Sequence, residues 1–318
     1  MKNGIKKAVA SIVFMLGLVC LLVILSYIFL PKNNMKAFGM EDVTANGILG
    51  EKENSIDVLV LGDSESYSSI TPMQIWEEQG FTTYVCGTPG QYLYQSASYL
   101  QQAFINQKPK VVILETNAIY RKMSFNASIL NRIENVFAVF KYHNRWKSMQ
   151  LGDLTSSADY TWTDDFKGYQ YYNTVDGTAN SDYMAPTDKS KLIHGLNWQY
   201  VSDMADFCEK NGAQFILVST PSTVNWNYER HNGIVQLANA LDIPYVDMNL
   251  MKNEITIDWT KDTRDKGDHL NHSGAVKVSR WLGNYLKKAY NLPDHRQDDG
   301  YSKWNEALTR YKKGVGEA

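Results

Sequence analysis

A serine near the start of the chain and a histidine near its end have the surroundings of a nucleophile and a base. Ser64 follows Leu61-Gly62-Asp63, which closes an apolar run and precedes a predicted helix. A serine in such a turn can expose its Oγ near the positive end of the helix dipole. His269 lies in an acidic stretch before the last predicted helix, and a serine needs such a base to accept its proton. The pair indicates nucleophilic catalysis, although Gly-Asp-Ser alone also fits a helix N-cap.

Two aspartates are candidates for the carboxylate that fixes the tautomer of His269. Asp268 is adjacent to it, and Asp265 lies a few residues earlier. The side chains of adjacent residues in an extended loop tend to point in different directions, so Asp268 is expected to turn away from His269. We therefore favour Asp265 and keep Asp268 as the alternative. Asp265, Asp268 and His269 form a cluster with Asp262 and His272 that could also bind a metal ion. Its spacing matches no calcium loop, so we expect no metal.

A parallel sheet would bring these distant residues together. From residue 55 onward, short apolar runs alternate with helical segments, which predicts a sheet covered on both faces. The expected fold is a flavodoxin-like three-layer α/β/α fold with a mainly parallel five-stranded sheet, whose sites lie at the carboxyl ends of the strands. The predicted strands are 57–61, 84–86, 110–114, 214–219 and 244–247, and the predicted helices are 72–79, 91–107, 190–211, 228–241 and 273–290.

The N-terminal segment predicts a single-pass membrane anchor. Residues 8–30 form an uncharged apolar run that, at about 1.5 Å per residue, is long enough for a hydrocarbon core of about 30 Å. Lysines within residues 1–7 place the N-terminus in the cytoplasm and the rest of the chain outside. The run is longer than a signal-peptide core, and no cleavage site follows it. Because the residues before Cys20 form no lipobox, an uncleaved signal anchor in the cell membrane is favoured.

The remaining segments complete the predicted organisation. Residues 31–54 are expected to form a polar stalk, residues 55–290 the catalytic domain and residues 291–318 a C-terminal tail. Within the domain, the alternation stops over about residues 121–187, a stretch rich in Asn, Asp, Tyr and Trp. It is too long for an ordinary connection, so it is expected to form a lid or substrate wall. A surface excursion without a direct role fits equally well.

Composition excludes some classes of function. A formal net charge of −2 leaves no surplus of cations to neutralise phosphates, so no nucleic-acid partner is expected. The 20 tyrosines and eight tryptophans suit contacts with sugar rings, although aromatic residues mostly fill cores. The three cysteines provide no disulfide framework. We expect no cofactor.

The order of these motifs resembles the SGNH (GDSL-type) hydrolase superfamily. Gly-Asp-Ser follows the first strand, a glycine the second and an asparagine the third, and an Asp/His pair precedes the last helix. The resemblance covers most of the predicted catalytic domain and implies that Ser64 is the nucleophile and His269 the base. It also implies that the N–H groups of Ser64 and Gly87 and the amide of Asn117 stabilise the oxyanion. Gly90 competes with Gly87 for the glycine position.

The chain departs from the family pattern at two positions. After the third strand, the family motif is Gly-x-Asn-Asp, whereas this chain has Glu115-Thr-Asn117-Ala. Only the asparagine of that motif is therefore present here. The acid of the family lies three residues before the histidine, where this chain has Lys266. This second departure leaves the choice between the two aspartates open.

Within the superfamily, the anchor and the sequence Asp268-His-Leu-Asn-x-x-Gly-Ala resemble the extracytoplasmic group that includes DltD and the alginate acetylation proteins. The resemblance implies a serine esterase or O-acyltransferase acting on acetyl or D-alanyl esters of a cell-wall or secreted glycopolymer, or on a small acyl-ester donor. A membrane-bound O-acyltransferase would be a partner. The alternative is a non-catalytic anchored protein that binds a polymer or that membrane enzyme. Trp226 and His231 are candidates for substrate binding, and a structural role suits them equally.

Overall fold

The computed structural model describes residues 2–317, which divide into two compact units. Met1–Val43 and Ser124–Trp162 form the first unit, and Thr44–Met123 and Thr163–Ala318 form the second. Met1 and Ala318, the outer ends of the predicted cytoplasmic segment and C-terminal tail, lie outside the described residues. The second unit contains the sheet, and the first contains the N-terminal helix.

The sheet of the second unit has the strand order β2-β1-β3-β4-β5, and every neighbouring pair is parallel. This order is that of flavodoxin-like sheets, so the predicted fold class is confirmed. All five predicted strands are present within a residue or two of their expected bounds. They are β1 (Val58–Gly62), β2 (Thr83–Gly87), β3 (Val111–Glu115), β4 (Gln214–Ser219) and β5 (Tyr245–Asp247).

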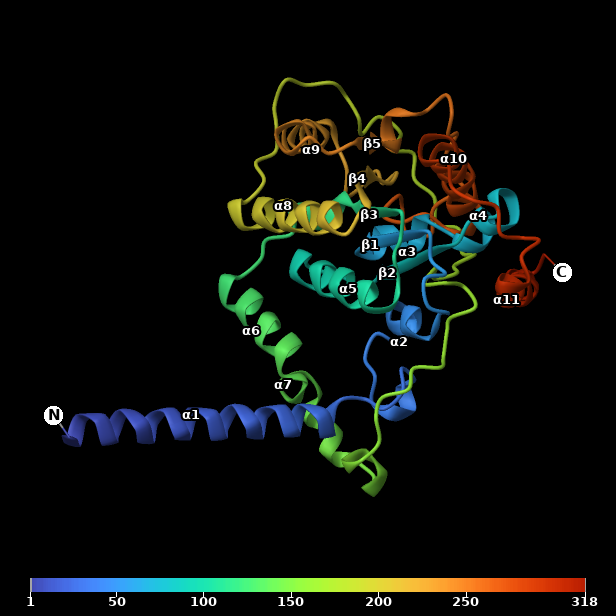
Figure 1. Cartoon of the computed structure of the whole chain (residues 1–318). Coiled ribbons are helices and arrows are strands. Elements are labelled where there is room, and N and C mark those ends of the chain that lie inside the picture. The colour runs from blue at the N-terminus through green and yellow to red at the C-terminus, as the bar shows by residue number, and fades with distance from the viewer. Residues whose placement is uncertain (1, 318) are drawn as a thin grey trace. The chain divides into compact units, whose positions relative to one another are not determined.

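Helices cover both faces of this sheet (Figure 1). On one face lie α4 and α10, and on the other lie α5, α8 and α9. The bounds are α3 (Ser64–Ser69), α4 (Pro72–Gln79), α5 (Leu93–Asn106), α8 (Gly195–Lys210), α9 (Tyr228–Leu241) and α10 (His272–Tyr290). Helix α8 begins five residues later than predicted, because His194 caps it by accepting the Leu196 N–H at 3.3 Å.

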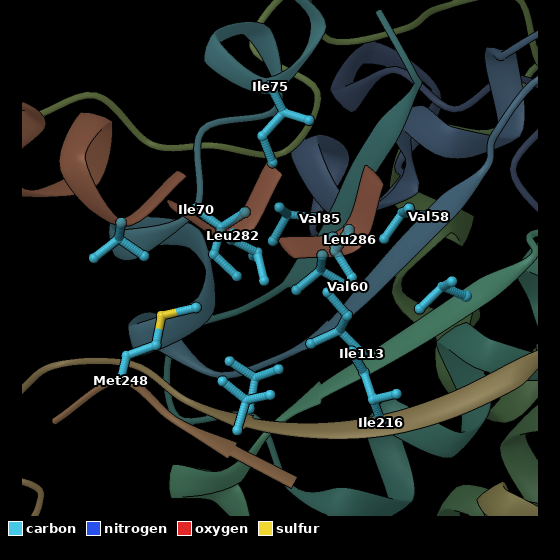
Figure 2. Close-up of a cluster of buried hydrophobic side chains, with 14 of the residues drawn as sticks. Val58, Val60, Ile70, Ile75, Val85, Ile113, Ile216, Met248, Leu282 and Leu286 are labelled. Atoms are coloured by element: carbon cyan, nitrogen blue, oxygen red, sulfur yellow. The ribbon is translucent and has the colours of Figure 1, made fainter. Parts of the chain in front are cut away.

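Alternating strand residues form the core between the sheet and helices α4 and α10. Val60, Ile113 and Ile216 come from three adjacent strands and belong to one buried cluster with Leu282 of α10 (Figure 2). Each of these side chains is 0% exposed. Both faces of a sheet covered in this way need apolar residues, which explains the continuous apolar runs of the strands. The rigid core fixes where each strand ends, and therefore where the residues after β1, β3 and β4 lie.

The segment predicted as one insertion divides between the two units. Its first part, with α6 (Phe125–Val136) and α7 (Ala138–Tyr142), belongs to the unit of the N-terminal helix α1 (Lys2–Phe29). Its second part belongs to the sheet unit and runs as an extended strap. There the Gln170 N–H donates to the Tyr67 carbonyl at 3.0 Å, and the His272 N–H donates to the Tyr172 carbonyl at 2.7 Å.

Two segments are more ordered than their sequences indicated. Residues 44–50, assigned to a polar stalk, lie in the sheet unit, where Ile48 is buried. The C-terminal tail forms helix α11 (Ser302–Val315), which packs on α4. The Trp304 ring lies 5.4 Å from that of Trp76, and Tyr311 accepts a hydrogen bond from the Thr71 hydroxyl at 3.0 Å. The sequence of this segment has a short amphipathic pattern, but it does not indicate which surface of the protein the apolar side would pack against.

Candidate active site

The turn after β1 presents Ser64 as the first residue of α3. Asp63 is the N-cap of this helix, and its Oδ1 accepts the Glu65 N–H at 3.1 Å. Gly62 precedes it at a place without room for a side chain, because a Cβ there would lie 2.7 Å from the Glu115 Cβ. The cap and the close packing fix the backbone on the N-terminal side of the serine.

His269 lies on a tight loop between β5 and α10. Thr263 and Leu270 form an antiparallel bridge across its base. Inside the loop, the Thr263 hydroxyl donates to the His269 carbonyl at 2.8 Å and accepts the Gly267 N–H at 2.8 Å. One threonine side chain therefore closes the loop that carries the imidazole.

The loop brings the imidazole between the serine and a carboxylate. His269 Nε2 lies 2.8 Å from Ser64 Oγ, and Nδ1 lies 2.7 Å from Asp265 Oδ2. The nearest oxygen of Asp268 is 3.6 Å from the same Nδ1. This arrangement can move a proton from the hydroxyl to the imidazole while the carboxylate stabilises the charge that forms. The structure thus favours Asp265 over Asp268, and the catalytic roles of all three residues stay predictions.

An unusual backbone explains why the acid is one residue further from the histidine than in the family pattern. Lys266 and Gly267 both have left-handed backbones, with φ of 60° and 91°. Two consecutive residues of this kind tighten the turn enough for Asp265 to fold back onto His269. Gly267 also lacks room for a side chain, because a Cβ would lie 2.0 Å from Thr223 Oγ1. Gly267 indicated a turn in the sequence, but it did not indicate which aspartate the turn would place beside His269.

Asn117 lies just after β3, and its side chain is held from two sides. Its Nδ2 donates to Asp63 Oδ2 at 3.0 Å, and its Oδ1 accepts from Arg230 Nη1 at 2.9 Å. An amide nitrogen has two hydrogens, so one remains after the bond to Asp63. The structure links Asn117 to the residue next to Ser64, and its role as an oxyanion donor stays a prediction.

The two candidate glycines have different surroundings. Gly87 lies opposite Gly62 in the sheet register, and a Cβ on it would come within 2.5 Å of Ser66 Oγ. Its lack of a side chain therefore has a packing reason. Gly90 has a left-handed φ of 63°, and the atom nearest to its Cβ position is an Arg121 nitrogen at 3.7 Å. Both glycines stay candidates for the oxyanion N–H.

Two buried carboxyl groups lie beside this site. Glu65 accepts from Asn225 Nδ2 at 2.7 Å, and its other oxygen has no partner among the described residues. Burial, followed by the nearby Glu115 and Asp63 carboxylates, raises the pKa of Glu65 well above its ordinary value. The pKa of Glu115 is raised to about 8, chiefly by burial and then by Asp63. A carboxyl group with a pKa of about 8, such as that of Glu115, is mostly protonated at neutral pH.

Three polar residues that hold the site were assigned no role from the sequence. Asp63 binds Asn117 and also Arg121, whose Nη2 lies 3.0 Å from Asp63 Oδ2. Asn225 donates to both Glu65 and Asp268 and so joins the turn after β1 to the His269 loop. Arg230 orients the Asn117 amide. All three follow β1 or β4 in the sequence, and polar residues at the carboxyl ends of parallel strands are expected near the site. This position could have identified them from the sequence.

Trp226 and His231 converge on one carboxylate rather than on the serine. The indole Nε1 donates to Asp247 Oδ2 at 3.0 Å, and His231 Nδ1 lies 2.8 Å from the same oxygen. Trp226 is only 3% exposed, so its ring has almost no surface to offer a substrate. This geometry favours the structural role for both residues.

The acidic residues near His269 include one group that is close enough together to hold a cation. Ligand atoms of Glu65, Asp268 and His269 lie within 4.8 Å of one another. Both ring nitrogens of His269 already have partners, so a cation bound there would have to displace one of them. Asp262 instead pairs with Lys277 at 2.6 Å, and His272 Nδ1 lies 3.1 Å from the Tyr169 hydroxyl. The donor set suits proton transfer better than cation binding.

Comparisons with known proteins give one kind of match. No family model and no curated protein matches the sequence. Solved structures of GDSL-type acylhydrolases are similar to this chain. A GDSL-like lipase from Bacteroides thetaiotaomicron is 16% identical, with a TM-score of 0.35, over 73% of this chain and 88% of that one.

Two further solved structures show the same pattern. A lipase/acylhydrolase from Enterococcus faecalis is 12% identical, with a TM-score of 0.40, over 75% of this chain and 98% of that one. An acetyl xylan esterase is 14% identical, with a TM-score of 0.37, over 73% of this chain and 98% of that one. At these values the likeness concerns the fold, and the chemistry must be inferred from the side chains.

Proposed function

We propose that this protein is a membrane-anchored serine esterase or O-acyltransferase. The observation that carries the proposal is the chain of contacts from Ser64 Oγ through His269 to Asp265, with separations of 2.8 and 2.7 Å. Hydrogen-bonded serine, imidazole and carboxylate groups in this order are the parts that nucleophilic acyl transfer requires.

The reaction proceeds in two halves. Ser64 Oγ attacks the carbonyl carbon of an acyl ester while its proton passes to His269 Nε2. The bond to the leaving alcohol then breaks as His269 returns that proton to the alcohol oxygen. In the second half, water or a sugar hydroxyl loses its proton to His269 and attacks the acyl-serine ester. The acyl group leaves with that acceptor, and the proton returns to Ser64.

Anchoring is supported by helix α1. Residues Asn3–Phe29 are long and apolar enough to cross a membrane, and none of the most apolar stretch is buried within the protein. With lysines before the helix, the sheet unit would lie on the extracytoplasmic side of the cell membrane. There it would meet the acylated glycopolymers that the DltD and alginate-acetylation resemblance implies, beside a membrane-bound O-acyltransferase.

Labelling with a serine-directed fluorophosphonate tests the catalytic proposal. The full chain in detergent micelles should form one covalent adduct on Ser64, located by mass spectrometry of the digested protein. Ser64→Ala should remove the adduct. Ser66→Ala is the matched control, because Ser66 lies in the same helix and bonds the Asp63 carbonyl at 2.7 Å. A folded protein without an adduct would favour the non-catalytic accessory protein.

Hydrolysis and transfer are distinguished by the product. Incubation with an O-acetylated polysaccharide and an acetyl-free acceptor sugar should release acetate if water is the acceptor. If a sugar hydroxyl is the acceptor, the acceptor sugar should gain mass. A D-alanyl ester offered in place of the acetyl ester tests which acyl group the enzyme takes. Ser64→Ala should abolish either product.

A further inference from the structure

Helix α6 carries an exposed apolar face. Four of its five large exposed apolar residues recur at spacings of three or four residues, so they share one side of the helix, and the fifth borders that side. All five are between 41% and 70% exposed, and they are Phe125, Ile129, Leu130, Ile133 and Val136. The polar residues Ser128, Asn131 and Glu134 recur on the opposite side. An amphipathic helix normally turns its apolar side to the protein core, and α6 does the reverse.

This helix belongs to the same compact unit as the candidate membrane span. Helix α7, which follows it, packs against α1, and the Val139 N–H donates to Ser26 Oγ at 3.3 Å. Next along the chain, Arg145 donates to the carbonyl groups of Phe29 and Leu30 at 2.7 and 2.8 Å. A guanidinium on the last carbonyls of α1 satisfies groups that a helix end leaves unpaired. The segment that contains α6 therefore clamps the carboxyl end of α1.

The rest of this segment has the features of a membrane interface. Trp146 is 65% exposed, and Lys147 lies 5.8 Å from its ring centroid. Leu151 is 87% exposed. Exposed tryptophan beside lysine is typical of the level of lipid headgroups. Apart from Arg145 and Asp153, which are buried and paired with each other, residues 125–154 contain three Lys and Arg against one Glu, a surplus of cations that suits anionic lipids.

We infer that α6 and the α7 region lie in the outer leaflet interface of the membrane, with the apolar face of α6 in contact with lipid. The inference rests on the proposed anchoring by α1. With 12 residues α6 is too short to cross a bilayer, but it suits a helix lying in the plane of the interface. The occupant of the exposed face is the lipid bilayer itself.

Site-specific fluorescence in phosphatidylglycerol-containing nanodiscs tests this inference on the full chain. Three proteins carry an environment-sensitive label on one accessible cysteine, and quenching by nitroxide lipids is measured. In the unsubstituted chain the label is on Cys20 of α1, which is exposed, whereas Cys86 and Cys208 are buried. The second protein combines Cys20→Ser with Ile133→Cys. The third combines Cys20→Ser with Ile105→Cys, a control position on α5 that is 76% exposed and apolar.

The inference predicts blue-shifted emission and strong lipid quenching at positions 20 and 133, with water-like, unquenched emission at position 105. Quenching at position 20 but not at 133 would overturn the inference and leave the anchoring intact. No quenching at position 20 would show that the proposed anchoring fails, and the inference would fail with it. Blue-shifted emission at 133 without lipid quenching would overturn the inference in favour of a protein, either a second copy or a membrane partner.

Discussion

Asp265 holds His269 with both of its carboxylate oxygens. Oδ1 accepts the backbone N–H of His269 at 2.6 Å, and Oδ2 lies 2.7 Å from its Nδ1. The first contact fixes the backbone of the histidine and the second fixes its ring. A carboxylate bound in this way has little freedom to turn from the imidazole. This distinguishes Asp265 from its neighbour Asp268, which reaches the imidazole only at 3.6 Å.

Replacing the two aspartates separately should give unequal losses of activity. Asp265→Asn removes the charge that stabilises the imidazolium and favours the wrong tautomer, so kcat should fall about 10²- to 10⁴-fold. Asp268→Asn keeps the contact geometry with Asn225, and we expect less than about a tenfold loss. Steady-state hydrolysis of a chromogenic acetyl ester measures both variants. A larger loss in Asp268→Asn would reassign the acid.

Removing the amide of Asn117 should slow the chemical step more than it weakens substrate binding. If this amide stabilises the oxyanion, Asn117→Ala should lower kcat about 10²- to 10³-fold with little change in KM. Asn232→Ala is a matched control, because Asn232 also donates a side-chain amide, to the Thr187 and Lys189 carbonyls, away from Ser64. Equal kinetics for the two variants would remove Asn117 from the proposed mechanism.

Glu115 should make the protein less stable as pH rises. Its pKa is about 8 in the folded protein, whereas an unfolded glutamate has a pKa of about 4.3. Between these values the folded state keeps a proton that the unfolded chain has lost. The free energy of unfolding should therefore decrease as the pH rises toward 8.

Urea unfolding of the full chain at several pH values measures this slope. Glu115→Gln should reduce it without abolishing it, because the raised pKa of Glu65 contributes a slope of the same sign. The exposed Glu53→Gln serves as the control and should leave the slope unchanged. An unaltered slope in Glu115→Gln would mean that Glu115 is ionised in the folded protein at neutral pH.

Gly62→Ala should destabilise the sheet unit. The added Cβ would lie 2.7 Å from the Glu115 Cβ and 2.9 Å from the Ser66 Cβ, so rigid backbone must shift. Overpacking of this kind costs about 1–3 kcal/mol of unfolding free energy. Gly195→Ala is the matched control, because its Cβ position has no atom within 4 Å apart from those of its chain neighbours and its own helix backbone. Chemical denaturation of both variants measures the difference, and equal stability would contradict the close packing.

The sheet was predictable because its signals are local. Uninterrupted apolar runs such as Gln214–Ser219 mark buried parallel strands, and the structure has β4 with the same bounds. The closeness of Ser64 and His269 was also predictable, because the carboxyl ends of parallel strands lie at one edge of the sheet. The preference for Asp265 rested on the divergence of neighbouring side chains. The geometry that favours it depends on two left-handed residues that no sequence period reveals.

Other features depend on contacts that the sequence does not record. The stretch 121–187 lacks a strand–helix alternation, and nothing in its composition indicated that residues 124–162 form a unit with α1. The C-terminal helix is amphipathic, but the surface that receives Trp304 is formed by a helix more than two hundred residues earlier. The bond between Asn225 and Glu65 likewise joins the loop after β4 to the first turn of α3, 160 residues apart.

Asp63 has a consequence for any effort to change what this protein accepts. Its Oδ1 caps the helix that begins with Ser64, and its Oδ2 holds Asn117. Two groups with different predicted roles in the same attack step thus share a single support, and they cannot be repositioned independently by altering it. Directed evolution of new specificity should therefore keep Asp63 constant. It should diversify the strap around Tyr172, whose ring lies 3.6 Å from the Arg264 guanidinium at the edge of the His269 loop.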